Sequence, residues 1–555
     1  MHRFLPALAR CVLTLTVVAV PAARADLPAS VEALWTEEVR IRMESDAADG
    51  IVLARGESLT SVESLRRFYV DRFHAPLWLD ERAFGRRVEA MRAAIRAASA
   101  HGLRPRDYHL AALETLGPTP PADPAAAVGA ELLLSDAWLR LASHLLHGKV
   151  DPRTIHPSWT ASRRERDLPA LMASAVGEGR IGEALAELAP RHPDYRLLVD
   201  ALARLRALRE AGGFTPVPVD EVLREGVRGP AVLALRARLE EAGEAVDASD
   251  PDPEAFGPAL TEAMRRVQER LGLEADGVAG ARTLAALNVP VQSRIDSILA
   301  SLERFRWLPD DLGERHVLVN VAGFWLRLEI GGRAVLEMPV VVGRDYRQTP
   351  VFSSTISYVV VNPSWEIPQS IARRDKVPDF QRDPAAMVAS GYEVLEGWGQ
   401  ASRPLDPSAI DWAALRGQPF PFRMRQRPGP ENALGRVKFM FPNEHSVYLH
   451  DSPARELFAR SERGFSSGCV RLEQPLELLF AIFEGSEWTR SRLEALLESG
   501  TETTVPLPAD RRVAVHLLYW TAWVDPENRI QYRRDVYGRD ARLLVALRED
   551  ERPLD

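Results

Sequence analysis

One cysteine in the C-terminal half of the chain has neighbours that suit a nucleophile. Cys469 lies in the run Ser466-Ser467-Gly468-Cys469-Val470-Arg471, and the other cysteine, Cys11, falls in the N-terminal leader. A thiol attacks a carbonyl when a base takes its proton and N–H groups stabilise the oxyanion. His450, at the end of a strand-like run upstream, supplies a base. The backbone N–H groups of Gly468 and Cys469 supply the donors.

The same stretch of chain contains further residues that could serve such a site. A buried structural thiol is the alternative role for Cys469, but its small and charged neighbours favour a reactive one. Arg471 either binds a substrate carboxylate or braces the loop. Tyr448 shares the strand face of His450 and is expected to line the same pocket. The carboxylate of Asp451 is a candidate for orienting His450, because it is adjacent in sequence. Neighbours on a strand point to opposite faces, however, so a backbone carbonyl is an equal candidate.

The N-terminus has the pattern of a secretory signal peptide at residues 1–25. Arginines precede a short apolar stretch at 11–22, and a small-x-small cleavage site follows at 23–25. No later segment reaches the roughly 18 consecutive apolar residues of a membrane helix. We therefore predict an exported protein whose mature chain begins at Asp26 and has no integral membrane segment.

Composition limits the function classes further. The 555 residues, 46% of them hydrophobic, are typical of two to four globular domains. A formal net charge of −8 argues against nucleic acid or an anionic membrane as the main partner. One cysteine and one histidine without other clustered ligands do not make a zinc site, so we expect neither a metal nor a cofactor.

Residues 26–215 are expected to form a helical scaffold domain. Apolar residues recur at spacings of four and three over 84–98, and a second apolar helix is predicted over 131–147. No convergent polar cluster in this region resembles a catalytic site. Four scattered histidines are expected at the surface or in caps rather than as metal ligands: His101, His109, His144 and His147.

The hydrophobic pattern changes twice after the scaffold. Residues 216–290 have helical spacing, and the region 300–545 shows the alternation that is typical of strands. Between 371 and 422 the strand pattern is absent, and Pro, Asp, Gly and Trp dominate. An insertion of this size beside a site is typical of a mobile lid. The sequence therefore predicts a multidomain α+β protein with a β-rich catalytic domain.

The motifs around Cys469 resemble the signature of the L,D-transpeptidases, which is a histidine, a spacer, then Ser/Thr-x-Gly-Cys-x-Arg or Asn. Other blocks that match lie at 342–344, 349–352, 362–368, 428–435 and 441–443. Residues 216–290 resemble a three-helix peptidoglycan-binding module through the pattern Gln268-x-x-x-Gly272-Leu273-x-x-Asp276-Gly277-x-x-Gly280-x-x-Thr283. The order of leader, scaffold, module and lidded, YkuD-type catalytic domain resembles the large, YcbB-like periplasmic branch of this family.

The resemblance implies a periplasmic enzyme that crosslinks peptidoglycan through a cysteine acyl-enzyme on a tetrapeptide donor, with release of D-alanine. Cys469 is the implied nucleophile and His450 the implied base. Ser467 stands where many members carry a second histidine, which leaves His450 as the base. The implied oxyanion and substrate-binding residues are Gly468, Ser467, Arg471 and Tyr448. Implied partners are stem peptides, glycan and other cell-wall synthases, and carbapenems are implied to acylate the cysteine.

Two other functions stay open at this point. An L,D-carboxypeptidase or endopeptidase acting on the same stems forms the same acyl-enzyme and differs only in the acceptor. A non-catalytic wall-binding protein is disfavoured, because a relic domain has no reason to keep His450, Gly468 and Cys469 together. The acceptor is a second stem peptide, a lipoprotein lysine or a free D-amino acid.

Overall fold

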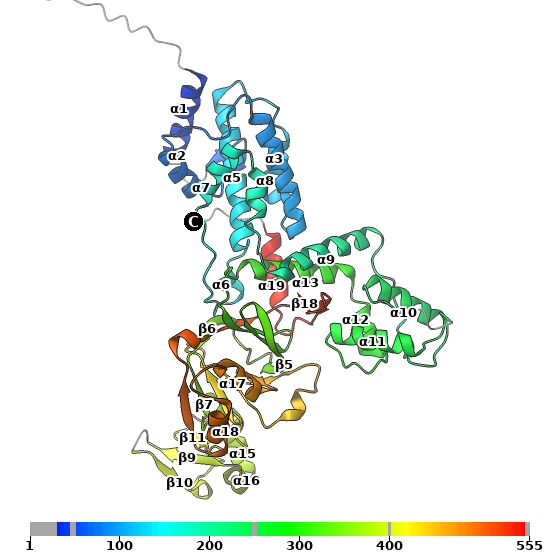
Figure 1. The fold of residues 1–555 in the computed structure, drawn as a ribbon, viewed down its shortest axis with the longest axis vertical. Helices are drawn as coiled ribbons and strands as arrows, with labels where there is room; N and C mark the ends of the chain where they lie inside the picture. Colours follow the sequence, from blue (N-terminus) through cyan, green and yellow to red (C-terminus); the bar gives the residue numbers. More distant parts are fainter. Residues whose placement is uncertain (1–29, 45–51, 247–251, 398–400, 550–555) are drawn as a thin grey trace, which may run out of the picture.

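The computed structural model describes residues 30–44, 52–246, 252–397 and 401–549, so the predicted signal peptide lies outside the described residues. A helical bundle forms one end of the molecule, and the β-rich region with its insertion forms the other (Figure 1). A small group of helices projects to one side between them. Within the described ranges, no helix combines the length and the apolar character of a membrane span.

The N-terminal bundle is built around α5 (Pro124–His147), whose residues are nearly all buried. The elements around α5 are α1 (Val31–Glu44), β1 (Leu53–Ala54), β2 (Glu57–Ser58), α2 (Val62–Asp71), α3 (Phe84–Ala97), α4 (Leu110–Glu114), α7 (Leu168–Glu178) and α8 (Ile181–Ala186). The predicted apolar face of α3 is confirmed, since Phe84, Val88, Met91 and Ile95 are buried. This end of the molecule is therefore a helical scaffold with a core of its own.

Two scaffold histidines differ from the prediction. His109 and His144 are buried rather than at the surface, and although His109 occupies the N-cap position of α4, its side chain makes no capping hydrogen bond. His109 Nε2 lies 2.8 Å from a carboxylate oxygen of Asp136, and His144 Nδ1 lies 2.9 Å from the hydroxyl of Tyr108. A buried imidazole is tolerated when its polar atoms find partners, and partners distant in sequence are invisible to a local pattern.

Two long helices join the three parts of the chain. α9 (Pro193–Glu210) and α13 (Val291–Arg306) pack against each other, and both contribute to the core that also contains the catalytic sheet. Between them in sequence, α10 (Pro230–Glu241), α11 (Pro258–Arg270) and α12 (Ala281–Leu287) form the predicted three-helix unit around a separate core. The scaffold and the small unit thus meet the catalytic domain through α9 and α13.

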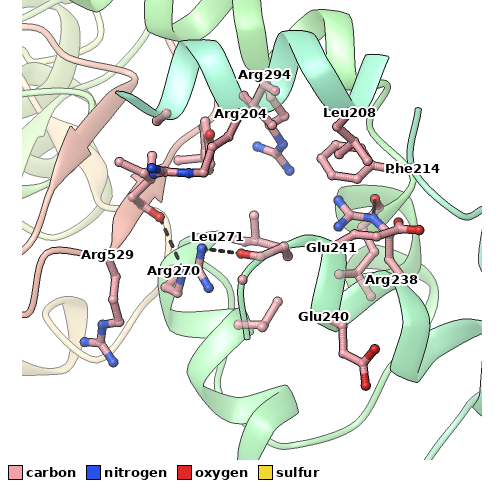
Figure 2. A pocket seen from close by; sticks show the side chains of 18 of the residues that line it. Arg204, Leu208, Phe214, Arg238, Glu240, Glu241, Arg270, Leu271, Arg294 and Arg529 are labelled. Carbon is pink, nitrogen blue, oxygen red and sulfur yellow. Dashed lines mark hydrogen bonds between the residues drawn. The ribbon is translucent and has the colours of Figure 1, made fainter. Parts of the chain in front are cut away.

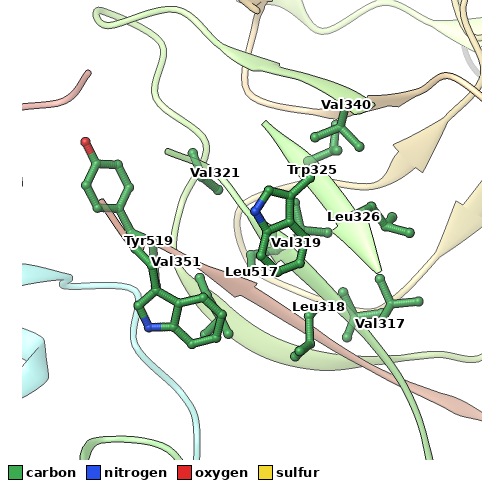
Figure 3. Close-up of a cluster of buried hydrophobic side chains, with 14 of the residues drawn as sticks. Val317, Leu318, Val319, Val321, Trp325, Leu326, Val340, Val351, Leu517 and Tyr519 are labelled. Carbon is green, nitrogen blue, oxygen red and sulfur yellow. The ribbon is translucent and has the colours of Figure 1, made fainter. Parts of the chain in front are cut away.

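The predicted catalytic region is a mixed sheet in the order β16-β7-β12-β13-β15-β5-β4-β3-β17-β6, with β14 also paired to β5. The strands are β3 (Arg315–Asn320), β4 (Trp325–Ile330), β5 (Arg333–Gly343), β6 (Phe352–Ile356), β7 (Tyr358–Val361), β12 (Val437–Met440), β13 (Leu449–His450), β14 (Gly464–Ser466), β15 (Val470–Leu472), β16 (Thr503–Pro506) and β17 (Val513–Leu518). Apolar side chains from β3, β4 and β17 interdigitate in its core (Figure 3). Val317 and Val319 lie in this core, and Leu318 between them is buried too, so both faces of β3 are covered.

Helices and a hairpin complete the catalytic region. They are α6 (Pro152–Ile155), α17 (Pro475–Phe483), α18 (Arg490–Glu498), β18 (Ala522–Val524), β19 (Ile530–Tyr532) and α19 (Arg539–Arg548). α17 and α18 bury Leu478, Leu479 and Leu493 in the same core as the sheet. The C-terminal α19 contacts α13, which ties the end of the chain to the helices that link the three parts.

The insertion is a folded subdomain, which corrects the prediction that strands are absent between 371 and 422. It contains α14 (Gln369–Ile371), α15 (Val377–Arg382), α16 (Pro384–Ala389), β9 (Tyr392–Glu396) and β10 (Arg403–Leu405), and a small sheet in the order β10-β9-β11-β8 includes β8 (Trp365–Glu366) and β11 (Arg423–Gln426). Phe380 stacks on Trp412 with ring centroids 4.3 Å apart. Strands this short carry too few alternations to stand out from the surrounding Pro and Gly residues.

Candidate active site

Parallel pairing of β13 with β15 sets the predicted histidine beside the cysteine loop. Leu449 pairs with Val470, and His450 pairs with Arg471. Leu449 and Val470 are fully buried in the core. Because side chains alternate along a strand, the residues next to them lie on the opposite face of the sheet. Cys469 and Arg471 therefore share a face with His450, and a single cavity is lined by all three.

The neighbouring strand β12 adds a cation that the sequence reading missed. Lys438 pairs with His450 across the antiparallel ladder. Its ammonium group lies 4.0 Å from the centroid of the Tyr448 ring, and that ring lies edge-on to His450 at 5.6 Å between centroids. The structure thus places Tyr448 in the pocket, as its strand position predicted. The strand pattern could have predicted the position of Lys438 as well, because this residue alternates with the buried Val437 and Phe439.

The imidazole of His450 is oriented by a backbone carbonyl. His450 Nδ1 lies 2.5 Å from the carbonyl oxygen of Asp451. A carbonyl only accepts, so Nδ1 carries the hydrogen and Nε2 is left as an acceptor. The carboxylate of Asp451 instead accepts hydrogen bonds from the N–H groups of Arg436 and Ser452, at 2.8 and 2.7 Å. Burial, reinforced by the charge of Arg471, lowers the pKa of His450 to about 3, so the ring is neutral at pH 7.

The thiol of Cys469 is half-buried, and its Sγ lies 3.9 Å from the carbonyl oxygen of Ser446. Burial raises the pKa of the Cys469 thiol, and it outweighs the hydrogen bonds of Tyr448 and the charges of Lys438 and Arg471, which lower that pKa. The resting pair is therefore a thiol beside a neutral imidazole rather than a thiolate–imidazolium ion pair.

The turn before the cysteine uses one of the two predicted oxyanion donors internally. The N–H of Gly468 donates to Ser466 Oγ at 3.0 Å, and that hydroxyl donates to the carbonyl oxygen of Cys469 at 2.5 Å. Among the described residues, the N–H of Cys469 has no acceptor. Gly468 has φ of +121°, a backbone conformation that favours glycine. In this structure the free donor is thus the Cys469 amide, and Gly468 shapes the turn.

Ser467 connects the cysteine loop to the insertion. Its Oγ accepts a hydrogen bond from Arg347 Nη1 at 2.8 Å. The same guanidinium pairs with both carboxylate oxygens of Asp375 at 2.6 and 3.1 Å, and Asp375 lies in the insertion segment Ala372–Lys376. The Ser467 side chain thus contacts a residue that holds the insertion, a link that sequence motifs do not reveal.

A cavity of about 1210 Å³ lies over this face of the sheet and reaches the insertion. Its lining contains more cations than anions: Arg344, Arg347, Arg374, Lys376, Arg382, Lys438 and Arg471 against Glu366, Asp375, Asp379 and Glu502. Among the described residues, no carboxylate lies within ion-pair distance of Arg344, Arg374, Lys438 or Arg471. Arg471 Nε is buried without a hydrogen-bond partner. The pocket therefore suits a substrate that carries carboxylates.

Comparison with known proteins places this site in a recognised domain. Residues 314–487 match the model of the "L,D-transpeptidase catalytic domain". Residues 228–287 match the "Putative peptidoglycan binding domain", and residues 63–202 match the "Scaffold domain". The chain thus contains an L,D-transpeptidase catalytic domain with a scaffold and a peptidoglycan-binding module. These matches confirm the predicted resemblance to the large, YcbB-like members of that family.

Individual proteins and solved structures that are similar to this chain are also described as L,D-transpeptidases. A "Putative L,D-transpeptidase" of Haemophilus influenzae is 36% identical over 256 residues, which cover 46% of this chain and 50% of that protein, so the match spans about half the length of the relative. Among solved structures, an L,D-transpeptidase of Xylanimonas cellulosilytica is 16% identical over 54% of this chain and 99% of that one, with a TM-score of 0.18. L,D-transpeptidase 3 of Mycobacterium tuberculosis, solved with a faropenem-derived adduct, is 13% identical over 37% of this chain and 60% of that one, with a TM-score of 0.17.

Proposed function

We propose that this protein is a peptidoglycan L,D-transpeptidase that works through an acyl-enzyme on Cys469. The observation that carries the proposal is the shared sheet face of Cys469 and a neutral, carbonyl-anchored His450 inside the matched catalytic domain. A neutral imidazole with a free Nε2 is the form of histidine that accepts a proton. A thiol with a raised pKa needs such a base at the moment of attack.

The acylation step follows from these groups. Nε2 of His450 takes the proton of Cys469 Sγ as the sulfur forms a bond to the carbonyl carbon that precedes the terminal D-alanine of the donor stem. The N–H of Cys469 donates to the resulting oxyanion. The C–N bond then breaks, and the imidazolium gives its proton to the leaving amine. An acceptor amine attacks the thioester and its proton passes to His450. The C–S bond then breaks, and the imidazolium returns the proton to the sulfur, which regenerates the thiol.

Substrate binding is assigned to the cation-rich wall of the pocket. Stem peptides carry carboxylates, and Arg344, Arg374 and Arg471 are cations that lack carboxylate partners among the described residues. Of the two roles considered for Arg471, we propose carboxylate binding, since its buried Nε has no hydrogen-bond partner that would brace the loop. The insertion covers the donor and excludes water, so that an amine competes with hydrolysis.

The location follows from the substrate. Domains that match peptidoglycan-acting families indicate an extracytoplasmic protein. We propose the periplasm, reached through the signal peptide at 1–25. Other cell-wall synthases are proposed partners, because crosslinking acts on strands that they make.

Incubation with purified disaccharide-tetrapeptide, followed by intact-protein and product mass spectrometry, tests the function. A transpeptidase gives a thioester on Cys469, free D-alanine and crosslinked dimers when an acceptor stem is present. A carboxypeptidase gives the thioester and a tripeptide without dimers. A wall-binding protein gives neither thioester nor product, and that result would end the proposal.

The contact between Arg347 and the insertion leads to a first prediction. Asp375→Asn weakens the pairing of the insertion with Arg347, which is partly exposed and worth about 1 kcal/mol, so crosslinking should fall roughly fivefold. Alkylation of Cys469 by iodoacetamide should change little, and the ratio of hydrolysis to transfer should rise. Product analysis and labelling rates measure both effects.

Asp379→Asn is the matched control, because Asp379 pairs with Lys376 and Arg382 inside the insertion and not with the cysteine loop. We expect it to crosslink nearly as well as the unmodified protein. If Asp375→Asn also crosslinks at the full rate, this contact does not govern a lid, and the insertion is better explained as a docking surface for partner proteins.

A second prediction concerns inhibitors. A carbapenem has a strained carbonyl that mimics the scissile amide, so it should acylate Cys469. Intact-protein mass spectrometry should show one adduct, and peptide mapping should place it on the peptide that contains Cys469. The Cys469→Ala variant should show none. Turnover of the tetrapeptide without any adduct under the same conditions would contradict the prediction.

A further inference from the structure

A second cavity, of about 410 Å³, lies where α9, α13, the small three-helix unit and β19 meet (Figure 2). Its apolar wall includes Leu205, Leu208, Phe214, Leu271, Leu287 and Ile530. Its polar wall contains five arginines: Arg204, Arg238, Arg270, Arg294 and Arg529. A pocket with an apolar wall and converging cations suits an amphipathic anion.

Two of these arginines are already paired. Arg529 forms ion pairs with Asp525 and Glu527 at 2.8 and 3.1 Å. Arg270 lies 3.3 Å from Glu244 and donates to two backbone carbonyls as well. These contacts stabilise the junction and leave little capacity for a ligand.

In the described part of the chain, the lining carboxylates form no ion pair with the remaining three, although the charge of Glu241 acts on Arg238 from a longer distance. Both oxygens of Glu241 accept hydrogen bonds from Thr215, at 2.7 and 2.5 Å. Glu240 is exposed and points away from the cavity (Figure 2). Among the described residues, Arg204, Arg238 and Arg294 therefore have no carboxylate within ion-pair distance.

Aromatic rings hold two of the unpaired guanidinium groups in place. Arg238 lies 3.6 Å above the Phe214 ring and donates through Nε to the carbonyl of Leu287, while its Nη1 is buried without a partner. Arg294 lies 4.6 Å from the Tyr532 ring centroid and donates through Nη2 to the carbonyl oxygen of Ala286 at 2.8 Å. Only 3% of the Arg238 surface is exposed, so its charge is held in the cavity at a cost in desolvation. A bound anion would offset that cost.

We propose that this cavity binds a carboxylate group of peptidoglycan, with the carboxylate between Arg238, Arg294 and Arg204 and the adjoining apolar atoms against Phe214. The identity of the ligand rests on the proposed function and on the module match, since Arg238 belongs to the matched residues. The cavity lies apart from the one that contains Cys469 and shares no lining residue with it. It therefore gives the protein a second binding site for peptidoglycan, outside the acylation site.

Calorimetric titration of the full chain with disaccharide-tripeptide tests the proposal, because this ligand lacks the terminal D-alanine and cannot acylate Cys469. Arg204→Gln and Arg294→Gln should each weaken one binding step about tenfold, the usual effect of losing one charged hydrogen bond. Arg204 is exposed, so its variant keeps the fold even if Arg294→Gln does not. Arg265→Gln, an exposed change on the same module that removes only a pair with Glu262, should leave Kd unchanged.

The outcomes separate this site from the catalytic one. Unchanged binding of the muropeptide in both arginine variants overturns the proposal. Inorganic phosphate that binds as tightly as the muropeptide also overturns it, because equal affinity indicates a general anion site. Weaker binding after amidation of the muropeptide carboxylates supports it. The thioester on Cys469 is measured separately, with the disaccharide-tetrapeptide. Loss of tripeptide binding in Arg204→Gln together with an intact thioester supports both the site and the function. Arginine-dependent binding without any thioester would refute the function alone.

Discussion

Replacing Cys469 with alanine should abolish crosslinking, with no turnover above the uncatalysed background. The thioester needs the sulfur, and no other cysteine lies in the described residues. The fold should survive, because the thiol is half-buried and its polar contacts, to Tyr448 and at 3.9 Å to Ser446, are the weak ones of a thiol. We expect a loss of stability below about 1 kcal/mol. Product mass spectrometry measures the first effect, and thermal denaturation checks the second.

Cys469→Ser is the matched variant for the chemistry. It keeps the shape of the side chain and the hydrogen-bonding turn around it, but its hydroxyl is a much weaker nucleophile at neutral pH. Both variants should be inactive and folded. Residual crosslinking in either one would mean that the acyl group is carried elsewhere, and the assignment of the nucleophile would be wrong.

The second large effect is expected at His450. His450→Ala should slow acylation by roughly 10²–10⁴-fold, the usual contribution of a positioned general base. Burial raises the pKa of Tyr448 well above its usual value, so the phenol on the same face is no substitute. Stopped-flow acylation by a chromogenic β-lactam, compared between the variant and the unmodified protein, measures the effect.

Lys438→Met is the matched control, because it removes the neighbouring cation without touching the imidazole. The charge of Lys438 lowers the pKa of the Cys469 thiol, so this variant should raise that pKa further and slow acylation only modestly. An equal loss in both variants would show that acylation depends on Lys438 as much as on His450, and it would overturn the assignment of His450 as the sole base.

The pH dependence gives an independent check on the base. The pKa of His450 is lowered from 6.5 to about 3, so the ring stays neutral, and able to accept a proton, until the pH approaches that value. We therefore expect kcat/KM for acylation to show no loss as the pH falls through 6.5. Iodoacetamide labelling of Cys469 should need a higher pH in His450→Ala. An unchanged labelling profile would show that another group activates the sulfur.

The sequence by itself determined the local features of this protein. Period-two alternation predicted the strand-rich region over 300–545, and helical spacing predicted α3, because a repeated apolar spacing records how an element is buried. The spacing of motifs around Cys469 predicted the family resemblance that the domain matches confirm. Residue type and strand position also predicted that Tyr448 lines the pocket.

Only the tertiary structure decided which groups meet. The parallel pairing that sets His450 beside Arg471, the Arg347–Asp375 contact and the orientation of His450 by a carbonyl all depend on packing between separate segments. The hydrogen bond from Gly468 to Ser466 depends on the turn that brings the Ser466 hydroxyl to the Gly468 N–H. The insertion was read as irregular because its strands are short and its core is assembled from distant aromatic residues. Local patterns record burial within one element, whereas contacts between elements are chosen by the free energy of the whole fold.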